Sequence, residues 1–191
     1  MHIQELVKSS RSFRRFDERV EIPEKKQRKW LEALRYIPSA RNLQPLRYVV
    51  VRSFEARERF FPLLGWAAYL KGKGTPQQGE RPTLYVVIGY DTRLSPSLPA
   101  IDIGIAAQTL LLLARADGYG GCVIGSFDPE KIKNLLEVDD HFGVGLVVAL
   151  GKPKEKIKIV PVTGSIEYYR DEKGTHYVPK RALSELWIKT L

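Results

Sequence analysis

The feature that most constrains the fold is a long apolar segment in the second half of the chain, residues 100–116. Apolar or small side chains occupy nearly every face of a helix built from these residues, so such a helix must be covered on most sides. Gly118 follows at a position typical of a helix C-terminus. The most apolar part contains Gln108 and is shorter than the roughly 20 residues that a membrane span requires. The segment therefore predicts a core helix of a globular domain.

Shorter apolar runs predict the strands that this helix would cover. They are rich in β-branched and aromatic residues and occupy residues 48–51, 83–90, 122–124 and 144–150. Helical spacing and start signals predict further helices over residues 2–9, 23–36, 54–64, 128–136 and 181–188. Strands mixed with helices predict an α+β or α/β fold, and the absence of a linker predicts a single domain over residues 1–191.

Three stretches fall outside this core pattern. Residues 65–82 are rich in Gly, Pro and Gln and predict an irregular excursion. Residues 166–170 and 176–178, separated by a polar turn, predict a hairpin-like excursion. Residues 152–158 are basic and predict an exposed surface.

The composition is that of a globular protein, since 43% of the 191 residues are hydrophobic and 28% are charged. No N-terminal apolar segment resembles a signal peptide. Cys122 is the only cysteine, which rules out an internal disulfide and fits a reducing cytoplasm. Because its neighbours are apolar, we expect the Cys122 thiol to be buried and unreactive.

The net charge of +9 is unevenly distributed along the chain. Residues 1–60 carry a net charge of +7, and residues 61–191 carry a net charge of +2. A basic N-terminal third favours an anionic partner, which could be a nucleic acid, a membrane surface or a small phosphate-bearing ligand. A solubilising surface explains the same charge, so composition leaves these alternatives open.

A short polar loop, residues 38–45, precedes the first predicted strand. Its first residue is a proline, which ends the preceding helix because it lacks an N–H and clashes with the turn before it. Ser39, Asn42 and Gln44 then place one hydroxyl and two amides within six residues. Loops on a rigid scaffold often carry ligands, although an ordinary helix-to-strand loop uses the same residue types.

Three segments, in this order, resemble the nitroreductase family of flavoenzymes. The first is the R-S-x-R-x-F sequence of residues 11–16, and the second is the S-x-x-N-x-Q-P sequence of residues 39–45. The third combines Asp102, Gly104 and Gln108 with the glycine-rich residues 118–125. The order and spacing of these segments extend the resemblance over most of the chain.

This resemblance implies a mostly antiparallel sheet flanked by helices, assembled as an intertwined homodimer. It also implies an enzyme that binds FMN, takes hydride from NAD(P)H and reduces a small-molecule oxidant, such as a nitroaromatic or a quinone. The flavin carries this chemistry, so no catalytic acid or base of the protein is required. Reductive dehalogenation, or a flavin that is bound and rarely turned over, are alternatives with the same flavin site.

The resemblance assigns Arg11, Ser12 and Arg14 to the flavin. Ser12 would donate to FMN oxygens, and Arg11 would contact the phosphate. Arg14 would face the N1/O2 edge of the ring, where a cation stabilises the negative charge that develops on reduction. Many relatives carry two basic residues before the serine, but Ser10 occupies the first of these positions here. Phosphate contacts from this segment therefore depend on Arg11 alone.

Two further segments are implied to contact the ring. Ser39, Asn42 and Gln44 would reach the flavin bound mainly by the partner subunit. Gly125, with Ile124 before it, would bring a backbone N–H close to N5, where glycine is suited to close approach.

The remaining implied residues lie in the two excursions and near the C-terminus. Lys180 and Arg181 would bind the phosphate, with residues 152–158 as a rival basic run. Trp66 and Tyr69 would help to roof the substrate site, although core packing explains both at least as well.

Other chemistry finds little support in the sequence. His2, His141 and His176 are scattered, and no Cys/His group has the spacing of a metal site. A nucleic-acid-binding module is the main rival from another class, but the chain lacks a recognised binding motif. We therefore expect the partners to be a second copy of the chain and a small oxidant, with no nucleic acid, no membrane and a cytoplasmic location.

Overall fold

The computed structural model describes residues 2–70, 72–94 and 99–191. Its centre is a five-stranded antiparallel sheet formed by β1 Phe16–Asp17, β2 Leu46–Val51, β3 Leu84–Asp91, β4 Gly120–Ile124 and β5 Phe142–Pro153. β3 pairs with β2 on one side and with β5 on the other, and both β4 and β1 pair with the opposite edge of β5. The predicted α+β fold with a mostly antiparallel sheet is confirmed.

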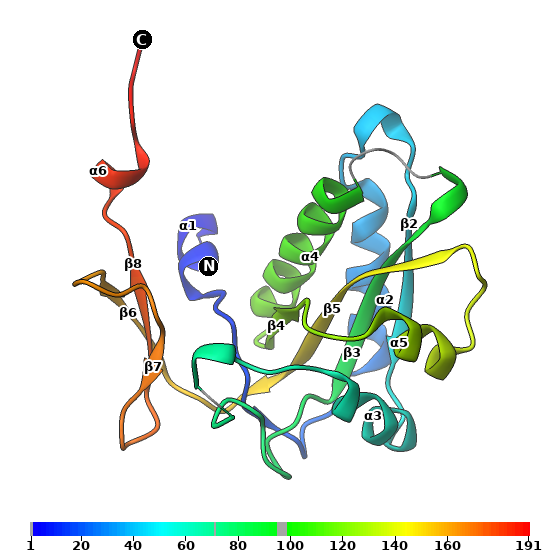
Figure 1. Ribbon diagram of the computed structural model, residues 1–191, viewed down its shortest axis with the longest axis horizontal. Coiled ribbons are helices and arrows are strands. Elements are labelled where there is room, and N and C mark those ends of the chain that lie inside the picture. Colours follow the sequence, from blue (N-terminus) through cyan, green and yellow to red (C-terminus); the bar gives the residue numbers. More distant parts are fainter. Residues whose placement is uncertain (1, 71, 95–98) are drawn as a thin grey trace.

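Helices cover both faces of this sheet (Figure 1). α2 Glu24–Ala33 and α4 Pro99–Ala116 lie on one face, while α3 Phe54–Phe60 and α5 Pro129–Leu136 lie on the other. Side chains alternate along β3, as the period of a strand requires. Leu84, Val86 and Ile88 join the core under α2 and α4, whereas Tyr85 and Val87 join the core under α3 and α5. The predicted central strand is therefore buried on both faces.

Local sequence signals set two of the helix ends as predicted. The Asp128 carboxylate accepts hydrogen bonds from the amides of Glu130 and Lys131, at 3.1 and 3.4 Å, and Pro129 is the first residue of α5. Gly118 ends α4 with a φ of +83°, a conformation that glycine adopts without strain.

The apolar helix α4 differs from its prediction in one respect. Asp102, Ile103, Ala106 and Leu110 on its inner face are buried, but Ile101 on its outer face is 52% exposed. A single chain therefore covers one face of α4 instead of most of its sides. Among the described residues α4 is also the one helix whose length and composition would allow a membrane span, but its inner face belongs to the apolar core.

A second, three-stranded sheet lies beside α1 Ile3–Ser9, away from the main sheet (Figure 1). It consists of β6 Ile157–Pro161, β7 Tyr169–Arg170 and β8 His176–Lys180, with β8 parallel to β6 and antiparallel to β7. The β7–β8 hairpin confirms the prediction, whereas β6 begins within a basic run that the charge pattern assigned to exposed surface. Ile157 and Ile159 alternate with Lys158 in β6, which is the pattern of a strand with one face toward solvent.

The chain ends in a segment with few contacts. The predicted helix over residues 181–188 is only one turn long, α6 Leu183–Leu186. Trp187 and Ile188 are 61% and 86% exposed. Within the described part of the chain no apolar face covers these side chains, and an isolated helix this short is not stable without packing.

Candidate functional site

The N-terminal segment, residues 11–16, lies along β4. Ser12 bridges to Gly121, and the amide of Phe13 donates to the Gly121 carbonyl at 3.0 Å. A Cβ on Gly120 would lie 2.6 Å from the Phe13 ring, so the absence of a side chain there permits this close approach. Phe16 then enters the sheet as β1 and is fully buried. The segment is therefore fixed at both ends by the main sheet.

A buried carboxylate, Glu155, fixes the middle of this segment. Its side chain is only 2% exposed. One oxygen accepts the Arg14 amide at 2.5 Å, and the other accepts Nη2 of Arg170 at 2.8 Å. The Arg14 guanidinium lies over the Tyr168 ring, with Cζ 5.0 Å from the ring centroid, and its Nη1 donates to the Ser12 carbonyl at 3.4 Å. Arg14 is thus held without forming an ion pair of its own among the residues described.

Arg11 is a partly desolvated cation. Its Nη2 donates to the Val7 carbonyl at 2.8 Å, while Nε is buried and has no hydrogen-bond partner in the described part of the chain. Burial lowers the pKa of the Arg11 guanidinium. Arg11 lines a cavity of about 460 Å³ together with Lys8, Arg115 and Glu155, whose carboxylate is already ion-paired with Arg170. Three cations around one cavity, one of them with an unused donor, suit an anionic group.

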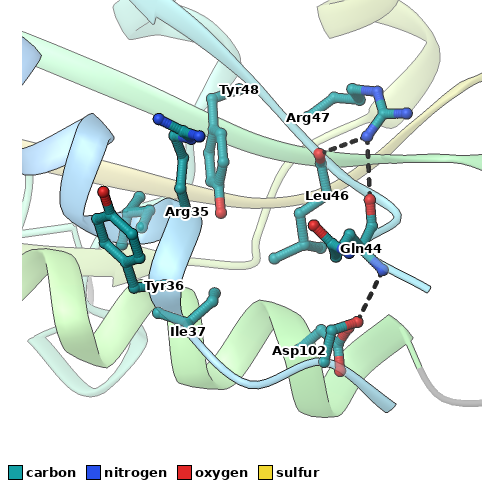
Figure 2. Close-up of a pocket in the computed structure, with 10 residues that line it drawn as sticks. Arg35, Tyr36, Ile37, Gln44, Leu46, Arg47, Tyr48 and Asp102 are labelled. Atoms are coloured by element: carbon teal, nitrogen blue, oxygen red, sulfur yellow. Dashed lines mark hydrogen bonds between the residues drawn. The ribbon is translucent and has the colours of Figure 1, made fainter. Parts of the chain in front are cut away.

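The polar loop of residues 39–44 is attached to the start of α4 (Figure 2). The Ser39 hydroxyl donates to Oδ2 of Asp102 at 2.5 Å, and the Ala40 amide donates to Oδ1 at 3.3 Å. The Ser39 oxygen in turn accepts the Gln44 amide at 3.0 Å. Asp102 is 1% exposed, so this loop is also held by a buried carboxylate.

The loop backbone is strained. Arg41, Asn42 and Gln44 have φ values of 54°, 55° and 48°, in the left-handed region that non-glycine residues rarely adopt. Each such residue costs about 1–3 kcal/mol and persists where surrounding contacts impose it. The hydrogen bonds to Asp102 and Ser39 supply that constraint.

These bonds limit what the loop can offer a ligand. A hydroxyl has one proton and two lone pairs, and Ser39 uses the proton on Asp102 and one lone pair on Gln44. Only one lone pair of Ser39 remains. The Asn42 and Gln44 side chains are exposed and bonded to each other at 3.1 Å, so they can exchange that bond for bonds to a ligand.

A cavity of about 270 Å³ lies behind the loop (Figure 2). Tyr48 of β2 is directed into it, and Asp102 lies at its base. Burial, with a smaller contribution from Asp102, raises the pKa of Tyr48 to about 12, so its hydroxyl stays protonated. Arg35 and Arg47 also line the cavity.

Gly125 follows directly after β4. A Cβ placed on it would meet only Leu146 Cδ1, at 3.9 Å, so the space above this residue is open. Ile124 before it is buried in the core. The position can therefore accept a flat ligand against the backbone.

Lys180 and Arg181 are not brought to the N-terminal segment by strand pairing. Lys180 is the last residue of β8, and Arg181 follows it into the exposed C-terminal region, where it forms an ion pair with Glu185 at 3.0 Å. Trp66 is 8% exposed and packs on Phe61 at 5.6 Å between ring centroids, which places it in the core. Tyr69 is 47% exposed, packs against Tyr168 with tilted rings whose centroids are 5.0 Å apart, and lines a cavity of about 620 Å³.

The two motif segments lie far apart within one chain. Asp102 anchors the loop at the start of α4, whereas Arg115 shares a cavity with Arg11 near its end. Asp102 and Arg115 are thirteen positions apart on this helix, a distance of about 20 Å along its axis. The two segments therefore lie toward opposite ends of α4.

The sequence did not single out Glu155, Tyr168 or the anchoring role of Asp102. Glu155 lies in a basic run that the charge pattern predicts to be exposed, but in the fold its side chain is buried and ion-paired with Arg170. Cys122 is buried as predicted, and burial raises the pKa of its thiol to about 12. No group of three His, Cys, Asp or Glu side chains among the described residues could hold a metal ion.

Comparison with known proteins identifies the family. The model of the Nitroreductase family matches residues 7–152, so the chain belongs to that family. "Putative NAD(P)H nitroreductase YdgI" of Bacillus subtilis is 26% identical over 185 residues, covering 80% of this chain and 88% of the relative. An NADH dehydrogenase of Thermus thermophilus is 30% identical over 181 residues, covering 76% of this chain and 84% of the relative.

A crystal structure in complex with FMN, from Exiguobacterium sibiricum 255-15, has the same fold. Its TM-score is 0.64 at 23% identity, over 80% of this chain and 88% of that chain. The predicted family and nitroreductase-like fold are thereby confirmed, and with them the class of enzyme, an oxidoreductase.

Proposed function

We propose that this protein is an FMN-dependent oxidoreductase that takes hydride from NAD(P)H and reduces a small-molecule oxidant, of which nitroaromatics and quinones are the candidate classes. The observation that carries the proposal is the N-terminal segment, where two arginines are held beside the start of β4, the strand that the open position Gly125 follows. Names of relatives that include NAD(P)H nitroreductase, and the FMN complex with the same fold, support this cofactor pair.

The residues present fit FMN. Arg11, with an unused buried donor, suits the phosphate, and Ser12 is exposed beside it. Arg14 carries a positive charge that no carboxylate neutralises directly within the described residues, as the N1/O2 edge of a reduced flavin requires. Gly125 leaves room for N5. Bound FMN would supply the hydride chemistry, and these residues would bind, orient and electrostatically favour it.

We also propose that the enzyme is a homodimer. The two motif segments lie toward opposite ends of α4, about 20 Å apart along the helix, which supports an arrangement in which the loop of one chain serves the flavin of its partner. The open face of α4 around Ile101 and the exposed C-terminal residues Trp187 and Ile188 supply apolar surface for such an interface. Lys180 and Arg181 would approach the phosphate through this C-terminal region.

The rival functions lack a specific observation in their favour. Three cations of the basic N-terminal third form ion pairs, Arg28 and Arg52 with Glu24, and Arg57 with Glu21. This pairing leaves fewer free cations for a nucleic-acid backbone. Reductive dehalogenation would use the same flavin site, and no described residue of the cavities favours it.

A spectrum of the purified protein tests the proposal. We expect a yellow protein that retains FMN through gel filtration and is bleached by NADH or NADPH under anaerobic conditions, with recovery when an oxidant is added. Light scattering on the same sample should give the mass of a dimer. A colourless protein that does not take up FMN on reconstitution would refute the proposed function.

A further inference from the structure

The guanidinium of Arg14, which would face the flavin, packs against an aromatic residue of the C-terminal excursion. Arg14 lies over Tyr168, the residue immediately before β7, although 154 positions separate the two in the sequence. Tyr168 is half-buried, and its ring also contacts Tyr69 at 5.0 Å and His176 at 5.3 Å. Rings on more than one side restrict the movement of Tyr168.

The surroundings of Tyr168 are fixed by charge. Arg170, two residues further on, bonds to Glu155 at 2.8 Å and to the Lys73 carbonyl at 3.3 Å. Glu155 accepts the Arg14 amide. The main chain of Arg14, the small sheet and the excursion that carries Tyr69 are therefore tied together at one carboxylate.

This arrangement holds a cation without neutralising it. An aromatic face attracts a guanidinium through its quadrupole and contributes no negative charge, whereas a carboxylate in the same place would cancel the field. Glu155 bonds to Arg14 through the main-chain amide and not through the guanidinium, and Arg170 compensates the Glu155 charge. The positive charge of Arg14 thus stays available to a ligand.

We infer that Tyr168 is a positioning residue for the proposed flavin chemistry, holding the Arg14 guanidinium at the flavin edge while Glu155 fixes the Arg14 main chain. The inference depends on the proposed function for its effect on the flavin, but the Arg14–Tyr168 contact is a property of the chain alone. Tyr168→Leu removes the aromatic face, and Tyr168→Phe keeps it. Tyr169→Leu is the matched control, because Tyr169 is 51% exposed and stacks on Tyr177 instead.

The first measurement needs no flavin. In flavin-free protein the Arg14 Nε–H resonance, assigned by its loss in Arg14→Lys, should show the upfield ring-current shift of a group above an aromatic face. Tyr168→Leu should abolish that shift, while Tyr168→Phe and Tyr169→Leu should retain it. An Arg14 resonance at the position of an unstructured arginine in the wild-type protein would overturn the inference.

The second measurement uses the FMN-loaded protein. Tyr168→Leu should lower the flavin potential toward that of Arg14→Ala and slow reduction by NAD(P)H about fivefold, which is the order expected for one cation–π contact. Tyr168→Phe and Tyr169→Leu should match the wild type, and adding Tyr168→Leu to Arg14→Ala should change the potential no further. Unchanged potential in Tyr168→Leu refutes the positioning role. A protein that shows the ring-current shift but binds no FMN refutes the proposed function instead.

Discussion

The two segments that resemble flavin-binding motifs are each held by a buried carboxylate, but the surroundings of the two carboxylates differ. A buried carboxylate fixes each one: Glu155 holds the N-terminal segment, and Asp102 holds the loop of residues 39–44. Glu155 is also ion-paired with Arg170, whereas no basic side chain in the described part of the chain pairs with Asp102. The N-terminal segment has ordinary backbone angles, while the loop contains three non-glycine residues with positive φ.

The difference shows two ways of preorganising a site. The N-terminal segment is stabilised by sheet pairing and by a compensated charge, so it can hold the Arg14 cation in a fixed place. The loop stores backbone strain and depends on one carboxylate to keep it, so it presents the Asn42 and Gln44 amides in a shape that the free backbone would avoid. Removing each constraint should therefore have a different consequence.

The largest effect should come from breaking the ion pair at the N-terminal segment. Arg170→Met leaves Glu155 buried and unpaired, which should lower the free energy of unfolding by about 3–5 kcal/mol in urea denaturation of the flavin-free protein. Arg181→Met is the matched control, because it breaks an exposed pair with Glu185 and should cost less than about 0.5 kcal/mol. Adding Glu155→Gln to Arg170→Met should recover much of the loss. If Arg170→Met and Arg181→Met lower the free energy of unfolding equally, the Glu155 charge is not desolvated.

Removing the anchor of the loop should have a smaller effect on stability and a larger one on the ligand. Asp102→Ala leaves the Ser39 hydroxyl and the Ala40 amide without their acceptor, at a cost of about 2 kcal/mol. The relaxed loop should weaken FMN binding, measured by quenching of flavin fluorescence, while the potential stays that of the wild type because Arg14 is untouched. Glu130→Ala, which removes an exposed carboxylate, should change neither. A changed flavin potential in Asp102→Ala would contradict the assignment of FMN affinity to the loop and of the potential to Arg14.

Acid should weaken the packing around Tyr168 that supports the N-terminal segment. His176 packs on Tyr168 and is 1% exposed, and burial lowers its pKa to about 4 from an ordinary value of 6.5. Between these values the unfolded chain binds more protons than the folded one, so stability falls as pH decreases through this range. The loss should be roughly 2 kcal/mol between pH 7 and pH 5, and His176→Phe should remove it. His141→Gln, at an exposed position, should leave the acid sensitivity as it is in the wild type.

Residues with local signals were predictable from the sequence, and residues defined by distant partners were not. The strands β3 and β5 and the start of α5 follow from apolar runs and from Asp128 with Pro129. The burial of Glu155 depends on Arg170, which no local pattern relates to it. The open face of α4 is consistent with its apolar sequence, which shows that a surface must be covered and does not show by which chain.

The smallest expected effect is a change in the free energy of unfolding on substitution to glycine. Its sign should differ between the two segments. Arg41 is exposed and has a φ of 54°, which costs a non-glycine residue about 1–2 kcal/mol. Arg41→Gly removes this strain, and the greater freedom of glycine in the unfolded chain offsets about 0.5–1 kcal/mol of the gain. We therefore expect the flavin-free variant to be about 0.5–1 kcal/mol more stable than the wild type in urea denaturation. Ser12→Gly, in the unstrained N-terminal segment, should be less stable by a similar amount because it gains only the unfolded-state freedom. If both variants lose stability, contacts outside the loop compensate the positive φ of Arg41, and the loop is not the strained member of the pair.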